Sequence, residues 1–97
     1  MAVTLCVLLW SVPGNEDLLV EYEDLVLARL SAHGGRVLQR VRRNETSVSP
    51  YEVQTLVFAS QEAMDSFMVD PERLALADMR AQCVAQTEII PVDLVDG

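Results

Sequence analysis

Residues 3–12 read VTLCVLLWSV, and this apolar run constrains the fold more than any other part of the chain. Its β-branched residues and its length favour a strand, and a strand that is apolar at nearly every position is buried on both faces. No basic residue precedes the run, which has about half the length needed to cross a membrane. We therefore expect a central strand of a covered sheet rather than a signal peptide or a membrane anchor.

A helical pattern follows this strand after Pro13-Gly14. We predict a helix from an N-cap at Asn15 to about Ala32, with acidic residues in its first turn, where they suit the positive end of the helix dipole. Apolar residues recur at spacings of three and four along it: Leu19, Tyr22, Val26 and Leu30. Acidic residues are expected largely on the other side: Glu21, Glu23 and Asp24.

The remaining elements are marked by their end signals. Gly34 stands where a helix ends on a left-handed residue, and a polar strand over 36–43 alternates valine with arginine, as at a sheet edge. A third, apolar strand is expected over 51–59. A helical region over 60–85 restarts at Asp70-Pro71-Glu72, which combines an N-cap with proline at the first helical position. A last strand over 87–95 contains Pro91, which favours an edge.

The resulting order, β-α-β-β-α-β, predicts a single ferredoxin-like α+β domain over residues 1–97. With right-handed crossovers, its four-stranded antiparallel sheet has the order 4-1-3-2 and carries two helices on one face. This order places the first and third strands in the centre. Those are the strands that are apolar on both faces, so the pattern and the topology agree.

The second face of such a sheet is left open by the helices. We expect one set of residues to meet the helices: Val3, Leu5, Val7, Leu9, Tyr51, Val53, Thr55 and Val57. The alternate set would form the open face: Thr4, Cys6, Leu8, Trp10, Glu52, Gln54, Leu56 and Phe58. In water this face would be a large apolar patch, so we expect a homodimer that packs the two open faces together around a two-fold axis.

The second strand has arginines at 36, 40 and 42, and Arg43 ends it. If Arg42 pairs with Glu52 across the strands, then Arg40 faces Gln54 and Leu38 faces Leu56, all on the open face. A cross-strand ion pair of this kind fixes the register and adds at most about 1 kcal/mol. Contact of these arginines with an anionic ligand is the alternative.

Charge and composition exclude several classes of function. The formal net charge is −8, so the chain lacks the basic surface that binding to nucleic acid or an anionic membrane requires. All seven basic residues are arginine, which excludes a Walker-type phosphate loop and a Schiff-base lysine. Two cysteines far apart in the sequence, Cys6 and Cys83, are expected to be free thiols in a reducing cytoplasm. One histidine and two distant cysteines form no metal pattern, and we expect no cofactor.

Candidate catalytic residues are His33 and Tyr22. Histidine is the side-chain type best suited to proton transfer near neutrality, although His33 also suits the end of a helix. Tyr22 lies on the apolar helix stripe and is an alternative proton carrier or a core residue. Candidate ligand-binding residues are drawn from the strands: Trp10, Arg40, Gln54 and Phe58.

Three stretches resemble a known superfamily: VEYED (20–24), HGGRVLQR (33–40) and DPERLALADMR (70–80). Together with the element order, they resemble the dimeric α/β-barrel superfamily, and most closely small actinobacterial proteins of the DUF1330 type. The resemblance implies a homodimer whose sheets form a shared barrel, with a pocket between sheet and helices. Wider relatives include cofactor-independent monooxygenases, muconolactone isomerases and haem-degrading enzymes. The Asn, Trp and His pattern of the haem-degrading enzymes has no counterpart here.

Two functions remain open. The first is a cofactor-independent enzyme, monooxygenase-like or isomerase-like, that acts on a small apolar or anionic metabolite. The second is a non-catalytic dimeric protein that binds a small molecule or serves as an accessory. A closed pocket with two or more inward polar groups would favour the enzyme. A filled barrel with Arg40 and Arg42 splayed into solvent would favour the second.

Overall fold

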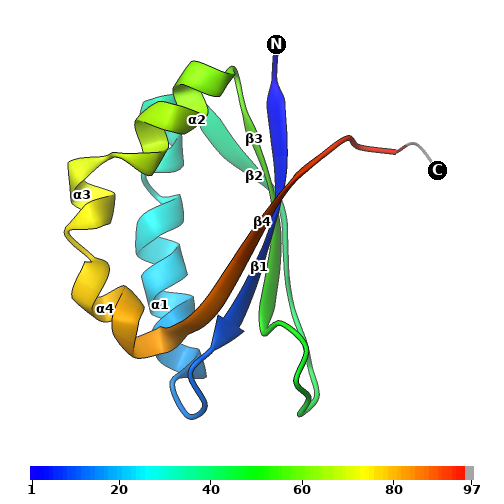
Figure 1. The fold of residues 1–97 in the computed structure, drawn as a ribbon, viewed down its shortest axis with the longest axis vertical. Coiled ribbons are helices and arrows are strands. Elements are labelled where there is room, and N and C mark those ends of the chain that lie inside the picture. Colours follow the sequence, from blue (N-terminus) through cyan, green and yellow to red (C-terminus); the bar gives the residue numbers. More distant parts are fainter. Residues whose placement is uncertain (96–97) are drawn as a thin grey trace.

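The computed structural model describes residues 1–95, which form a four-stranded antiparallel sheet with all helices on one face (Figure 1). The strands are β1 (Val3–Ser11), β2 (Gly35–Arg42), β3 (Glu52–Phe58) and β4 (Val84–Val92). The helices are α1 (Glu16–Leu27), α2 (Gln61–Met68), α3 (Pro71–Leu74) and α4 (Ala77–Cys83), with a 3₁₀ turn, η1 (Leu30–His33). The sheet order β2-β3-β1-β4 confirms the predicted ferredoxin-like topology.

The helix boundaries follow most of the predicted signals. Gly34 ends η1 with φ of 68°, the left-handed conformation expected there. Ser60 and Asp70 cap α2 and α3 through their side chains. The expectation of one helix to Ala32 was wrong, because α1 ends at Leu27 and η1 follows it. The second helical region is also divided, into α2, α3 and α4.

The assignment of faces was right for β1 and wrong for β3. Residues directly opposite in a sheet share a face, and Leu5 pairs with Leu56 while Val7 pairs with Gln54. The alternate set of β3 is therefore the buried set that meets the helices: Glu52, Gln54, Leu56 and Phe58. Val53, Thr55 and Val57 face the open side. When a strand is apolar on both sides, its sequence does not show which alternate set of residues faces the core. A shift of one residue exchanges the two sets.

The observed register of β2 differs from the predicted one because the strand contains a bulge. Arg42 pairs with Glu52 and Arg40 with Gln54, as expected, but the register shifts after Val37, which takes the place opposite Leu56 predicted for Leu38. Because they pair with the buried set of β3, Arg40 and Arg42 lie on the helix-covered face and not on the open one. The bulge therefore brings two arginines to the interior side of an edge strand.

The hydrophobic core fills the space between the sheet and the helices. It includes Leu5, Val7, Leu9, Leu19, Tyr22, Val26, Leu30, Leu56, Phe58 and Phe67. Four polar residues are buried: Glu23, Glu52 and Gln54 lie beside this core, and Asp70 caps α3. Placing Glu23 on the solvent side of α1 was therefore an error. Within residues 1–95, both cysteines are free, and no helix is long and apolar enough to cross a membrane.

Candidate functional site

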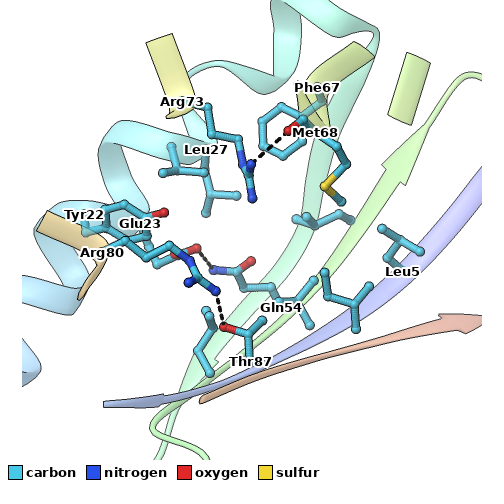
Figure 2. Close-up of a pocket in the computed structure, with 15 residues that line it drawn as sticks. Leu5, Tyr22, Glu23, Leu27, Gln54, Phe67, Met68, Arg73, Arg80 and Thr87 are labelled. Carbon is cyan, nitrogen blue, oxygen red and sulfur yellow. Dashed lines mark hydrogen bonds between the residues drawn. The ribbon is translucent and has the colours of Figure 1, made fainter. Parts of the chain in front are cut away.

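A cavity of about 80 Å³ lies between the helices and the covered face of the sheet (Figure 2). Its walls are largely apolar and include Leu5, Val7, Leu9, Val26, Leu56 and Phe67. Six polar side chains also reach it: Tyr22, Glu23, Gln54, Arg73, Arg80 and Thr87. Small-molecule sites commonly combine an apolar lining with a few convergent polar groups, so this cavity is the candidate site.

Glu23 is the buried acid of the cavity. It follows Leu19 by four residues and precedes Val26 by three, so it lies on the buried stripe of α1 and is only 5% exposed. Burial raises the pKa of its carboxyl above the ordinary value, and the hydrogen bond from Gln54 only partly opposes this effect. A carboxyl of this kind holds and releases a proton at higher pH than a surface glutamate, which suits a general base.

Gln54 connects Glu23 to a second buried acid, Glu52. Its Nε2 donates hydrogen bonds to Glu23 Oε1 at 2.7 Å and to Glu52 Oε2 at 2.6 Å. Glu52 also accepts from Arg40 Nε at 3.0 Å and from Arg42 Nε at 2.8 Å. Burial raises the pKa of Glu52, but the hydrogen bonds from Arg40, Gln54 and Arg42 outweigh it and hold the pKa below the ordinary value. Glu52 is therefore ionised at neutral pH.

Arg73 and Arg80 bring positive charge to the cavity from α3 and α4 (Figure 2). Arg73 Nη1 donates to the Met68 carbonyl at 3.1 Å, and its guanidinium lies 5.3 Å from the ring centroid of Phe67. Arg80 Nη2 donates to Thr87 Oγ1 at 3.1 Å. Neither forms an ion pair with a carboxylate of residues 1–95.

Tyr22 and Gln54 are the two predicted site residues that line this cavity. Burial raises the pKa of the Tyr22 hydroxyl, and the nearby charge of Glu23 raises it further, while Arg73 and Arg80 oppose the shift. The hydroxyl therefore stays protonated at neutral pH and is available as a hydrogen-bond donor.

The other four predicted site residues lie outside the cavity lining. Phe58 is fully buried in the core, with its ring centroid 5.6 Å from that of Phe67. Arg40 joins Glu52 to Asp24, and Trp10 donates from the open side of the sheet to the Val48 carbonyl at 3.1 Å.

His33 ends η1, where its Nδ1 lies 2.6 Å from Ser66 Oγ and its Nε2 lies 3.3 Å from Asp70 Oδ2. It therefore connects η1 to α2 and to the N-cap of α3. Its proposed catalytic role, like the ligand-binding roles of Trp10, Arg40 and Phe58, stays a prediction. Within residues 1–95, no group of three or more His, Cys, Asp and Glu side chains is placed to hold a metal ion.

The three charged residues of the cavity were not predicted as site residues: Glu23, Arg73 and Arg80. Glu23 had a usable signal, since its spacing from Leu19 and Val26 places an acid on an apolar helix stripe. Arg73 and Arg80 lie in short helices with apolar residues scattered between them, so the sequence pattern did not indicate which side chains turn inward.

No protein-family model matches the chain, and no curated protein matches its sequence. Solved structures do match over nearly its whole length. One, from Bacteroides thetaiotaomicron and only provisionally named an antibiotic biosynthesis monooxygenase, aligns with a TM-score of 0.81 at 14% identity, covering 98% of this chain and 90% of that one. A dabb family protein with a ferredoxin-like fold from Mesorhizobium loti aligns with a TM-score of 0.67 at 17% identity, covering 98% of both chains.

A third neighbour is a dimeric protein of unknown function with a ferredoxin-like fold from Bacteroides fragilis. It aligns with a TM-score of 0.68 at 16% identity and covers 96% of both chains. At these identities the likeness is one of fold. The comparisons thus agree with the sheet order that this chain is a ferredoxin-like α+β protein similar to dabb and monooxygenase-type structures.

Proposed function

We propose that the protein is a cofactor-independent proton-transfer enzyme that acts on a small, largely apolar substrate, with Glu23 as its general base. The observation that carries this proposal is a carboxyl group only 5% exposed, with a raised pKa, on the wall of an apolar cavity. The structural neighbour provisionally named a monooxygenase has a similar fold, which is compatible with such chemistry but does not identify it.

The reaction begins when ionised Glu23 takes a proton from a carbon next to a carbonyl group, or from a phenol. The electron pair left behind becomes an enolate or phenolate, and the neutral Tyr22 hydroxyl is suited to donate a hydrogen bond to its oxygen. Gln54 orients the Glu23 carboxylate through its 2.7 Å hydrogen bond. If the substrate has a β,γ double bond, the anion is a dienolate, and return of the proton by Glu23 to the γ carbon moves the double bond into conjugation, which is an isomerisation. In a monooxygenase-like reaction the same carbanion would add O₂ to form a peroxide, which loses hydroxide and leaves a carbonyl group.

The alternative is a non-catalytic protein that binds a small molecule in the same cavity. Two observations favour the enzyme. Several polar groups converge on the cavity, and Arg40 and Arg42 are paired with Glu52 instead of extending freely into solvent. A binding protein would not require a buried carboxyl without a cationic hydrogen-bond partner.

Solvent exchange tests the proposal directly. The protein is incubated in D₂O with 2-butanone or 2-oxobutanoate, and the loss of the C3 proton signals is followed by ¹H NMR. We expect exchange with the unmodified protein and none above background with Glu23→Gln. Glu21→Gln is the matched control, because Glu21 is an exposed acid on the same helix. Equal exchange rates in Glu23→Gln and the unmodified protein, or no exchange of either ketone, would contradict the proposal.

We also propose that a second copy of the chain covers the open sheet face. Apolar side chains are exposed on this face, including Val41 at 48% and Ile90 at 38%. The B. fragilis neighbour of similar fold is described as dimeric. We further propose that the chain belongs to the dimeric α/β-barrel superfamily, near DUF1330-type proteins. We also propose that it is located in the cytoplasm.

Sedimentation equilibrium at micromolar concentration measures this assembly. We expect a dimer, and we expect Val53→Asp on the open face to convert it to a monomer because the change buries a charge in the interface. Val69→Asp, at an exposed valine between α2 and α3 on the helix side, is the control and keeps the dimer. A monomeric unmodified protein would refute the arrangement.

A further inference from the structure

We propose that the ligand of the cavity is a short-chain monocarboxylate whose carboxylate binds Arg73 and Arg80. The inference deepens the proton-transfer function by naming the substrate class of the same site. The two guanidinium groups and the acid Glu23 reach the cavity from the helix layer, while the sheet supplies apolar side chains such as Leu5 and Val7. A short acid has the matching parts: one anionic end and one apolar end.

The pairing of the arginines is the first argument. The chain has fifteen acidic and seven basic residues, so carboxylates are plentiful. Arg29 pairs with Asp70 and Glu72, and Arg40 and Arg42 of β2 pair with Glu52. The other four arginines have no carboxylate partner in the described part of the chain, and of these Arg73 and Arg80 line the cavity, whereas Arg36 and Arg43 do not. This arrangement leaves positive charge where an anionic ligand would neutralise it.

The second argument is the positioning of these side chains. A guanidinium has five N–H donors, and one of them on each arginine is used by the Met68 carbonyl or by Thr87. Contact with Phe67 further orients Arg73. The Nε of Arg73 is buried and has no hydrogen-bond partner within residues 1–95. A buried donor of this kind normally has an acceptor, which a carboxylate oxygen would provide.

The third argument is size. Ligand sites for drug-sized molecules measure about 300–1,000 Å³, and this cavity measures about 80 Å³. The volume suits a molecule of only a few non-hydrogen atoms. Butyrate and 2-oxobutanoate are probes of this class, and 2-oxobutanoate also has acidic C3 protons for Glu23 to remove.

Isothermal titration with butyrate and with its neutral analogue butyramide tests the inference. We expect butyrate to bind and butyramide to bind at least about tenfold more weakly, because charge-assisted hydrogen bonds are lost. Arg73→Met and Arg80→Gln should each weaken butyrate binding about tenfold. Arg36→Gln, at an exposed arginine on the other side of the sheet, is the control and should leave the affinity unchanged.

Two further variants test the donor geometry and the charge of the binding site. Arg73→Lys keeps the charge but loses the forked donor geometry, so butyrate binding should fall less than in Arg73→Met. Glu23→Gln removes a negative charge near the ligand, so butyrate should bind as tightly as before or tighter. Circular dichroism melting confirms that each variant is folded.

The outcomes distinguish this inference from the proton-transfer function. Arginine-dependent butyrate binding without C3 exchange would support the ligand class and refute the reaction. Exchange of 2-butanone, with butyrate binding absent or unchanged in Arg73→Met and Arg80→Gln, would support the reaction and overturn the ligand class. Equal binding of butyrate and butyramide would also overturn it.

Discussion

Glu23 and Glu52 are buried carboxylates that accept hydrogen bonds from the same group, Nε2 of Gln54, yet their pKa values shift in opposite directions. Both lie on the covered side of the sheet and are at most 5% exposed. Glu52 has two arginines within hydrogen-bond distance. Glu23 has one neutral amide, so burial dominates its pKa. The difference teaches that cationic donors can hold a buried acid ionised even though burial favours its neutral form.

The position of each acid explains this contrast. Glu52 begins β3 and lies opposite Arg42 of an edge strand, which is where the bulge directs arginines inward. Glu23 lies on the central helix beside the cavity, and Arg73 acts on it only through its charge. The first acid is thereby fixed in an ion-pair network. The second is left to exchange protons with a ligand.

Removing the fixed acid should have the largest effect. Glu52→Ala leaves Gln54 and the inward arginines without their acceptor, and breaking a buried pair on one side costs about 3 kcal/mol. We expect the free energy of unfolding at pH 7, measured by urea denaturation, to fall by this amount. Because the pKa of Glu52 is lowered in the native state, its stabilisation is present above its unfolded pKa and is lost as the pH falls through its native pKa. The difference in unfolding free energy between the variant and the parent should therefore decrease at acidic pH.

Gln54→Leu removes the amide that the two acids share. Both carboxylates then lose a hydrogen bond that lowers their pKa, so both pKa values should rise, with Glu23 left as the less solvated of the two. We expect a loss of about 2 kcal/mol in unfolding free energy. Carboxyl ¹³C NMR titration measures the pKa values. An unchanged pKa of Glu23 would show that Gln54 does not contribute to its proton affinity.

The stability of Glu23→Gln relative to the parent should change with pH in the opposite direction to that of Glu52→Ala. The native pKa of Glu23 lies above its unfolded value, so the parent protein loses stability as the pH rises from the unfolded pKa to the native pKa. The glutamine variant does not titrate there. Its stability relative to the parent should rise with pH, by at most about 1.4 kcal/mol per pH unit, and level off above the native pKa. A relative stability that is flat from pH 4 to pH 9 would contradict the assigned burial.

Arg42→Gln should have the smallest effect. Its side chain is 39% exposed, and Glu52 keeps its contacts to Arg40 and Gln54 when Arg42 is lost. We expect a change below about 1 kcal/mol in unfolding free energy, decreasing with added salt. A loss as large as that of Glu52→Ala would mean that Arg42, and not the network, holds Glu52 in its ionised form.

The topology was predictable because each local signal was strong. The apolar run of β1, the left-handed Gly34 and the Asp70-Pro71 restart all lie where the pattern placed them. Strand order then followed from the handedness of crossovers and from which strands are apolar on both faces.

The site was less predictable because it depends on which residues of β3 face the helices and on which side chains of the helices point toward the sheet. In β3, alternate residues on both faces include apolar ones, so Gln54 was assigned to the site but to the wrong face. Glu23 was treated as a solvent residue because its charge was given more weight than its spacing. His33 stood out as the only histidine, but its contacts are with Ser66 and Asp70, away from the cavity.

The bulge at Leu38 also determines which changes of length β2 can tolerate. In a regular strand Val37 and Arg40 would point to opposite faces, whereas the extra residue places the partners of Leu56 and Gln54 on the same face. Substitutions in this strand alter one side chain at a time. Deletion of Leu38 itself would remove the bulge and leave the other side chains opposite their present partners in β3. Deletion of Val41, beyond the bulge, would instead move Arg42 from its place opposite Glu52 to the open face. The strand is therefore expected to tolerate the loss of one residue at the bulge but not nearer its end.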